Sequence, residues 1–315
     1  MYYQHSRQID VLRATVARMG RPDLLVIDLD GTLLGADGLV SDENAAALRR
    51  ANACGLPSLI ATGRTLSECQ SVLDSIGYAG PLIAASGSML LDVANRATLF
   101  RRSLSQHLVE SIVGCVLEAH GMAMILKDRH QTGVDYVFVG SGELHPVTQW
   151  WLDHTGASFE HVERIEDDPY PLDTVRIGAI GGPVEFMPLV SQLEDQYGED
   201  VLARHWEAVT SSAHAGEAVH LLEVFHPEAD KWTMIQSHCI KAGLDERRTA
   251  AVGDGLNDVL MIEQCGIGIA MANADHRVLA VADAVTGGNN EHGVATLIDD
   301  LLEGRIRLTG SVSNA

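Results

Sequence analysis

The chain has 315 residues, of which 46% are hydrophobic, and its formal net charge is -21 at pH 7. This length favours two domains, while the negative charge excludes sequence-independent binding of nucleic acid, which needs a basic surface that neutralises phosphates. No apolar run approaches the roughly 20 residues that cross a bilayer, and the five cysteines form no C-x-x-C pair, so we expect a cytoplasmic globular protein without a membrane partner, a disulfide framework or structural zinc.

The first expected elements are a helix and an apolar strand that ends in two carboxylates. The helix covers Gln8 to Met19, and the strand begins at Leu24 within LLVIDLDGTLL. This run is typical of a strand buried on both faces, and open α/β sheets place ligands at the carboxyl ends of such strands. Successive side chains of an extended segment point to opposite sides, so Asp28 and Asp30 are expected to have different roles. Gly31 allows the sharp turn that follows.

The next segment alternates helix and strand patterns. Ser41 is expected to cap the first helix, and Thr65 forms a capping box with Glu68 at the start of the second. The expected elements are a helix over Ala45 to Ala53, a strand over Pro57 to Ala61, a helix from Thr65 to about Gly77 and a strand over Pro81 to Ala85. This alternation predicts a parallel sheet with right-handed crossovers.

Between about Ser88 and Ala213 the pattern changes to strand-like pieces among longer helices. The last third then returns to the alternation of strands and helices. Its expected strands are His220 to Phe225, Thr249 to Val252, Ile267 to Met271 and Ala284 to Thr286, and its expected helices are Ala229 to Ala242, Leu256 to Gln264, Arg277 to Ala282 and Val294 to Leu302. We therefore expect one α/β domain built from residues 1–87 and 214–315, with residues 88–213 inserted as a second α/β domain.

A second group of acids, in the segment GDGLND from Gly253 to Asp258, directly follows the apolar strand TAAV. Asp254 stands at the strand-to-helix turn and Asp258 one turn into the helix, which puts both carboxylates on one side. With Asp28 they could hold a hard cation, and an open all-oxygen site suits Mg²⁺ better than zinc. One such segment alone is more often a turn with a helix cap, but two such strand ends in one sheet favour a metal site.

Thr62 and Lys231 supply what an acidic phosphate site lacks. The turn Thr62-Gly63-Arg64 offers a hydroxyl and backbone N–H groups next to a helix N-terminus, where phosphoryl oxygens bind readily. Lys231 offers a compact positive charge, and Arg64 is a candidate for substrate contact. Taken singly, the threonine is typical of a turn and the lysine of a solvated helix start. These residues therefore indicate a phosphate site only together with the acids.

The order of these motifs resembles one known family. DLDGT with Asp28, ATGR with Thr62, Lys231 and GDGLND with Asp254 resemble the four motifs of the haloacid dehalogenase superfamily, in this order and across the whole chain. The stretch from Ile269 to Leu302 further resembles the Cof-type branch, whose members carry an α/β cap of the C2 type between the second and third motifs. The resemblance implies an α/β fold with a Rossmann-like doubly wound parallel sheet as the core and the inserted α/β segment as a cap domain.

The resemblance also implies a cofactor and roles for individual residues. Asp28 would be the nucleophile that forms an aspartyl-phosphate, and Asp30 would protonate the leaving alcohol and then activate water. The candidate substrate-binding residues are Thr62, Gly63, Arg64, Lys231 and Asn257. The candidate ligands of Mg²⁺ are Asp28, the backbone carbonyl of Asp30, Asp254 and, as support of the metal shell, Asp258.

Two departures from the Cof-type pattern lie near the expected substrate side. Ser86-Gly87-Ser88 stands where members commonly have Asn-Gly-Ala, and Trp232 stands where a glycine usually follows the motif lysine. The first departure could change contacts with the leaving group, whereas Trp232 could simply pack under the cap.

The function that these residues favour is a magnesium-dependent phosphatase, with a small phosphorylated metabolite such as a sugar phosphate as its partner. A phosphomutase of the same superfamily is the alternative, because some relatives with a C2 cap use the same aspartate to move phosphate within a sugar. A third hypothesis is a non-catalytic module that binds a metal or a metabolite. The complete set of catalytic acids makes this hypothesis the least favoured.

Overall fold

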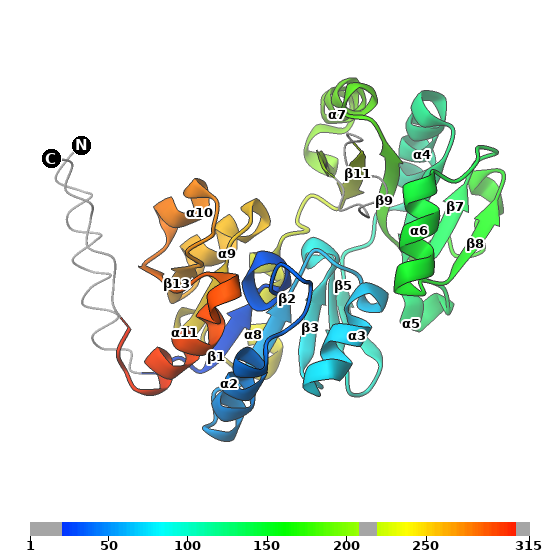
Figure 1. Cartoon of the computed structure of the whole chain (residues 1–315). Coiled ribbons are helices and arrows are strands. Elements are labelled where there is room, and N and C mark those ends of the chain that lie inside the picture. Colours follow the sequence, from blue (N-terminus) through cyan, green and yellow to red (C-terminus); the bar gives the residue numbers. More distant parts are fainter. Residues whose placement is uncertain (1–20, 208–218, 307–315) are drawn as a thin grey trace, which may run out of the picture. The chain divides into compact units, whose positions relative to one another are not determined.

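The computed structural model describes residues 21–207 and 219–306. The chain divides into a first unit, made of Met1–Gly63, Ser71–Gly87 and Asp230–Ala315, and a second unit, made of Arg64–Gln70 and Ser88–Ala229 (Figure 1). The helix expected over Gln8 to Met19 lies outside the described residues. None of the helices within these described ranges is long and apolar enough to cross a membrane.

The first unit is built on a parallel sheet, as its sequence pattern predicts. The parallel part of this eight-stranded sheet has the order β14-β13-β12-β1-β2-β3, with every neighbouring pair parallel. The strands are β1 (Leu24–Ile27), β2 (Ser58–Ala61), β3 (Pro81–Ala84), β12 (Thr249–Gly253), β13 (Ile267–Ala270) and β14 (Ala284–Val285). Because β1 lies between β12 and β2, the two acidic strand ends, at Asp28 and Asp254, are neighbours in the sheet.

The helices of the first unit begin where polar caps stand in the sequence. They are α2 (Asp42–Ala53), α3 (Leu66–Ile76), which the second unit shares, α8 (Lys231–Ala242), α9 (Val259–Gln264), α10 (His276–Val281) and α11 (Gly293–Leu302). Ser41 Oγ accepts a hydrogen bond from Asn44 N at 3.2 Å and so caps α2 as expected. Asp230 Oδ1 accepts from Thr233 N at 2.8 Å, which makes Lys231 the first residue of α8. Helix α2 packs against α11, while α8 and α10 pack against α9, and the Rossmann-like α/β fold class is confirmed.

The second unit has a mixed sheet of its own with strand order β10-β11-β9-β6-β7-β8. The helices and strands of this unit, of which β4 and β5 are not part of the six-stranded sheet, are β4 (Met89–Asp92), β5 (Ala97–Arg101), α4 (Gln106–His120), β6 (Ala123–Lys127), α5 (Arg129–Thr132), β7 (Tyr136–Val139), α6 (Pro146–Thr155), β8 (Phe159–Val162), β9 (Thr174–Gly181), α7 (Pro183–Tyr197), β10 (Leu202–Glu207) and β11 (His220–Phe225). Helices α4 and α7 bury one face of this sheet, where Val113, Ile125, Ile177, Phe186 and Leu222 form part of the core. The inserted segment is therefore an α/β unit with its own apolar interior.

The boundary expected at residues 213 and 214 differs from the structure at one strand. The sequence pattern predicts His220 to Phe225 as a strand of the first unit, but this strand, β11, pairs antiparallel with both β9 and β10, and the second unit extends to Ala229. The reason is visible in its side chains, because Leu222 and Val224 are buried in the second unit's core while Glu223, on the opposite face, pairs with Arg176. An apolar strand just before a helix has the same sequence pattern in either unit.

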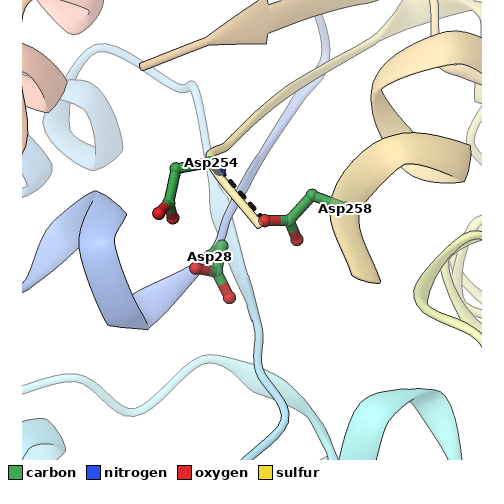
Figure 2. Close-up of side chains that lie close together, drawn as sticks. All are labelled: Asp28, Asp254 and Asp258. Carbon is green, nitrogen blue, oxygen red and sulfur yellow. Dashed lines mark hydrogen bonds between the residues drawn. The ribbon is translucent and has the colours of Figure 1, made fainter. Parts of the chain in front are cut away.

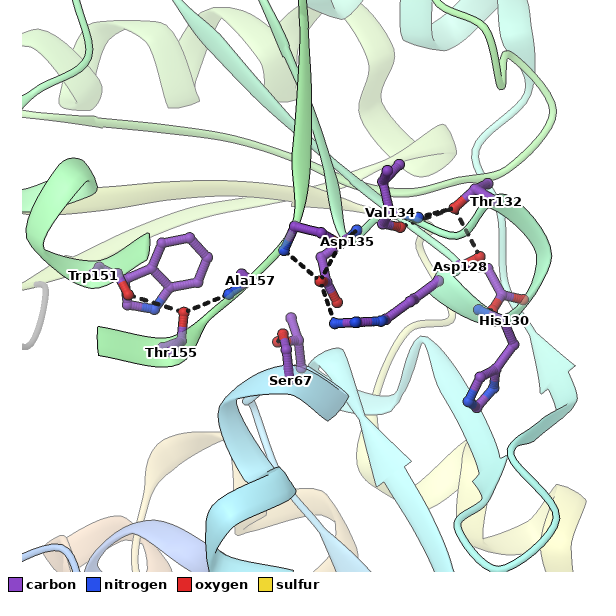
Figure 3. A network of polar contacts seen from close by, with 12 residues as sticks. Ser67, Asp128, His130, Thr132, Val134, Asp135, Trp151, Thr155 and Ala157 are labelled. Atoms are coloured by element: carbon purple, nitrogen blue, oxygen red, sulfur yellow. Dashed lines mark hydrogen bonds and ion pairs between the residues drawn. The ribbon is translucent and has the colours of Figure 1, made fainter. Parts of the chain in front are cut away.

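Buried acids in the second unit are matched by donors. Asp135 is nearly inaccessible and accepts hydrogen bonds from Arg129 Nη1 at 2.7 Å and from Ser158 N at 2.8 Å (Figure 3). Lys127 Nζ donates a hydrogen bond to Asp168 Oδ2 at 2.5 Å, and it also donates to the Tyr170 carbonyl and to Thr174 Oγ1. Pairing of this kind is what burial of a charge requires, so these acids have a structural role.

Candidate active site

The turn after β1 brings the nucleophile candidate and a second acid into contact range. The turn η1 (Leu29–Leu33) is closed by hydrogen bonds from Leu33 N to the Asp28 carbonyl and from Leu34 N to the Leu29 carbonyl. Gly31 has φ +73°, and a Cβ at this position would stand 2.2 Å from Asp254 Oδ2. A side chain here would be both strained and in collision with the carboxylate, so the glycine is required for the close approach of Asp254.

Three carboxylates meet at the ends of β1 and β12. Asp28, Asp254 and Asp258 each offer one oxygen within 4.8 Å of the others, the sole group of this kind found among the described residues (Figure 2). Asp258 lies in the turn η7 (Leu256–Asp258), and its Oδ2 accepts hydrogen bonds from the backbone N–H groups of Asp254 and Gly255 at 3.0 and 2.9 Å. The sequence prediction that these acids converge agrees with this geometry.

Lys231 is the positive charge within this acid cluster. Its Nζ lies 2.5 Å from Asp28 Oδ1 and 2.7 Å from Asp258 Oδ1, and the residue is 1% exposed. Gly87, with φ +97°, makes this position possible, because a Cβ there would stand 2.1 Å from the carbonyl oxygen of Asp230, the cap of α8. The start of α8 is therefore held tightly against the turn after β3.

The electrostatics of the cluster show an excess of negative charge. Burial raises the pKa of Asp28 well above its usual value, and the charge of Asp258 raises it further, against the opposing effect of Lys231. Burial alone would lower the pKa of Lys231, but the charges of Asp258 and Asp28 raise it overall, so the ammonium stays protonated. Burial also raises the pKa of Asp254 to about 6.

This arrangement fits a divalent cation. The three carboxylates have one ammonium among them, which contacts only Asp28 and Asp258, in contrast to the matched pairs of the second unit. Asp28 and Asp258 are buried. Their oxygens form a donor set of the hard type that Mg²⁺ prefers, and two or three protein ligands leave room for substrate and water. A bound dication would offset the negative charge of Asp258, which adds to the effect of burial in raising the pKa values of Asp28 and Asp254.

A second set of polar groups lies beside Gly63, at the end of β2. Thr62 is fully buried, and its backbone N–H donates to the Ile83 carbonyl at 2.8 Å. The point that a Cβ on Gly63 would occupy lies 3.5 Å from Ser86 Oγ and 3.7 Å from Asn257 Nδ2. Hydroxyl, amide and backbone groups of this kind can together hold phosphoryl oxygens.

The turn η2 (Ala85–Gly87) that carries Ser86 is strained. Ala85, Ser86 and Gly87 all have positive φ, at +48°, +57° and +97°. Two non-glycine residues in this region are costly, and such strain is concentrated at functional sites. This turn is the first departure from the Cof-type pattern, and it places the Ser86 hydroxyl beside Gly63.

The remaining site residues predicted from the sequence lie outside the acid cluster. Asp30 is exposed, and its carboxylate is not one of the three that converge in the described chain. Arg64 belongs to the second unit, where its Nη1 donates to the Glu68 carbonyl at 3.4 Å. Trp232 is buried, as a packing role requires.

Sequence reasoning missed two residues that hold the site. Thr32 Oγ1 donates to Asp254 Oδ1 at 2.8 Å, and Asn273 Nδ2 donates to the Gly31 carbonyl at 2.8 Å. Thr32 belongs to the DLDGT motif, so its position in the motif was an available signal. Asn273 is 242 residues from Gly31, and no local pattern indicates their contact.

Comparisons with known proteins agree on one family. The model of the haloacid dehalogenase-like hydrolases matches residues 25–298. The chain is 29% identical over 280 residues to the 5-amino-6-(5-phospho-D-ribitylamino)uracil phosphatase YcsE of Bacillus subtilis, covering 87% of this chain and 94% of the relative. It is 27% identical over 281 residues to a phosphoglycolate phosphatase of Methanopyrus kandleri, covering 89% and 97%. The fold is similar to that of a haloacid dehalogenase-like hydrolase from Bacteroides thetaiotaomicron, with a TM-score of 0.75 and 22% identity over 89% of this chain and 100% of that chain.

Proposed function

Because the chain belongs to the haloacid dehalogenase-like hydrolase family, we propose that it is a magnesium-dependent phosphatase that hydrolyses a small phosphorylated metabolite, such as a sugar phosphate, through an aspartyl-phosphate on Asp28. The family predicted from the four motifs is thereby confirmed, and the relatives are phosphatases. The single observation that carries the proposal is the buried ammonium of Lys231 between Asp28 and Asp258, at the edge of a group of three carboxylates.

Lys231 addresses the main obstacle to such a reaction. An anionic carboxylate that approaches a phosphate dianion is repelled, so positive charge must be in place before the two can meet. Lys231 Nζ donates a hydrogen bond to Asp28 Oδ1. The same ammonium group has further N–H donors that can bind a phosphoryl oxygen. Mg²⁺, held by Asp28, Asp254 and the Asp30 carbonyl, would supply further positive charge for the phosphoryl group when bound.

The proposed reaction has two steps with balanced proton transfers. A carboxylate oxygen of Asp28 forms a bond to phosphorus, the ester oxygen leaves, and Asp30 gives that oxygen a proton. Asp30 then removes a proton from water, the water oxygen bonds to phosphorus, and the bond to Asp28 breaks to release inorganic phosphate. One group thus acts as acid and then as base. Thr62, Gly63 and Asn257 hold the phosphoryl oxygens in both steps.

The relatives and the charge of the site support the proposed substrate class. The two relatives are named as phosphatases of monoesters of small hydroxylated molecules, and we extend that class to this chain. The positive charge in the acid cluster is confined to one lysine, which suits a single phosphoryl group.

A panel of phosphate esters tests the proposal. The panel contains sugar phosphates, phosphoglycolate, nucleotides and cofactor phosphates, each with Mg²⁺ or with a chelator, and inorganic phosphate is measured. We expect phosphate release from at least one sugar-type ester, loss of release with the chelator and recovery when Mg²⁺ is restored. An isomeric sugar phosphate without free phosphate would instead identify a phosphomutase. No reaction across the panel would favour a non-catalytic binding module.

A further inference from the structure

One asparagine from the C-terminal part of the first unit holds the turn that carries Asp30. Asn273 follows β13, and its Nδ2 donates to the Gly31 carbonyl at 2.8 Å. Its Oδ1 accepts from the backbone N–H of Asn289 at 2.9 Å, in the turn η8 (Asn289–Glu291). Both ends of the amide are therefore used, which fixes the orientation of the side chain.

The Gly31 carbonyl is held from outside its own turn. The hydrogen bonds that close η1 end on the carbonyls of Asp28 and Leu29, so neither of them holds the Gly31 carbonyl directly. Glycine has access to more backbone conformations than other residues, and here it directly follows the proton carrier. The bond from Asn273 adds a restraint on the backbone directly after Asp30.

The segment that carries Asn273 is anchored to the acid cluster. Met271 N donates to the Gly253 carbonyl at 3.0 Å, and Asp275 N donates to the Asp254 carbonyl at 2.9 Å. These bonds fix the segment on both sides of Asn273 to the end of β12. Asn273 therefore connects the backbone around Asp254 with the backbone around Asp30.

We propose that Asn273 is a positioning residue for Asp30, which it acts on by fixing the Gly31 carbonyl. The inference rests on the proposed function, because it takes Asp30 as the group that protonates the leaving oxygen. Asp30 directly precedes Gly31, so the backbone conformation of this turn sets the position from which its carboxylate reaches the ester oxygen. Loss of the bond from Asn273 would let that carboxylate move away from the ester oxygen, and a displacement of about 1 Å can cost about 100-fold in rate.

Asn289 offers a matched control in the same loop. Its Nδ2 donates to the Leu34 carbonyl at 2.9 Å, a bond of the same kind but beyond the turn that contains Asp30. Asn289→Ala removes this bond and keeps the backbone N–H that Asn273 accepts from. The two variants therefore remove equivalent bonds at different distances from Asp30.

The experiment compares two esters that differ in their need for a proton. An alkyl phosphate must have its leaving oxygen protonated, whereas p-nitrophenyl phosphate releases a stable phenolate. The measured quantity is kcat/KM, which reports the steps through release of the leaving group and is independent of the later hydrolysis. We expect Asn273→Ala to lower kcat/KM by about 10- to 100-fold for the alkyl ester and by less than about threefold for the aryl ester. Asn289→Ala should lower both values by the same small factor.

Asn273→Asp is a second variant that guards against a folding defect. It keeps the acceptor for the Asn289 N–H and replaces the donor to Gly31 with a charged carboxylate oxygen. Since Asn273 is exposed, neither variant leaves a buried cavity. Equal losses for the two esters in both Asn273 variants, or the same leaving-group dependence in Asn289→Ala, would overturn the inference. A wild-type protein that releases phosphate while Asn273→Ala is unchanged overturns only this inference. A wild-type protein without any turnover overturns the proposed function itself.

Discussion

Asp28→Asn is expected to abolish phosphate release, by roughly 10⁴-fold or more, while the protein stays folded. The asparagine amide has nearly the same shape but cannot form an acyl phosphate, so the covalent route is closed. Its oxygen can still accept the hydrogen bond from Lys231, which lies 2.5 Å from Asp28 Oδ1. The substitution also removes one of three neighbouring negative charges. The free energy of unfolding should therefore be unchanged or higher in the absence of metal.

Asp245→Asn is the control for this experiment. Asp245 is exposed to solvent and pairs with Arg247 away from the acid cluster, so its variant should keep turnover within about twofold, because exposed pairs contribute little. The measurements are phosphate release with Mg²⁺ and denaturant unfolding with a chelator. Near wild-type turnover by Asp28→Asn would show that Asp28 is not the nucleophile.

Lys231→Met should damage both stability and turnover. The methionine fills most of the space but leaves Asp28 and Asp258 buried without their shared partner, and breaking a buried ion pair in this way costs about 3–5 kcal/mol. Turnover should fall about 10²- to 10³-fold, because the variant lacks the ammonium that offsets repulsion between carboxylate and phosphate. Added Mg²⁺ should restore part of the stability, since it binds the folded state, and little of the turnover.

The stability loss in Lys231→Met should depend on pH in a defined direction. The pKa of Asp28 is raised in the folded protein mainly by burial, and removal of Lys231 raises it further. The folded variant therefore binds more protons than the unfolded chain, and its stability rises as the pH falls. The loss should grow as the pH rises through the raised pKa of Asp28, and it should be smallest near pH 4, where an unfolded aspartate titrates.

Lys241→Met, at the exposed end of the same helix, is the matched control. It should change the unfolding free energy by less than about 0.5 kcal/mol and leave turnover intact, as is usual for surface substitutions. Unfolding curves of both variants between pH 4 and pH 8 provide the comparison. A Lys231→Met protein as stable and active as Lys241→Met would contradict the role assigned to the buried ammonium.

The convergence of the acids could be predicted from the sequence because it depends on the sheet. Asp28 and Asp254 both end apolar strands, and parallel strands end at the same edge, so a correct strand assignment was sufficient to bring them together. The position of Lys231 was also within reach, because Asp230 is a strong helix cap and places the lysine at the start of α8.

Other features depend on contacts that leave no local pattern. β11 has the same apolar character in either unit, and only its pairing with β9 and β10 assigns it to the second. The left-handed conformation of Ser86 could not be predicted from the sequence, because serine usually avoids this region of backbone conformation. The hydrogen bond from Asn273 to Gly31 joins distant parts of the chain. Asparagine is common in turns and loops for other reasons, so its presence at position 273 does not indicate this contact.

The most direct test of the account is to trap the covalent intermediate. Enzyme with Mg²⁺ and a phosphate ester that it hydrolyses is quenched in acid during turnover, digested, and analysed by mass spectrometry for a peptide that carries one phosphoryl group. The phosphoryl group is expected on Asp28, and it should be absent from the Asp28→Asn protein treated in the same way. A phosphoryl group on another residue, or turnover by a protein whose Asp28 is never phosphorylated, would contradict this expectation.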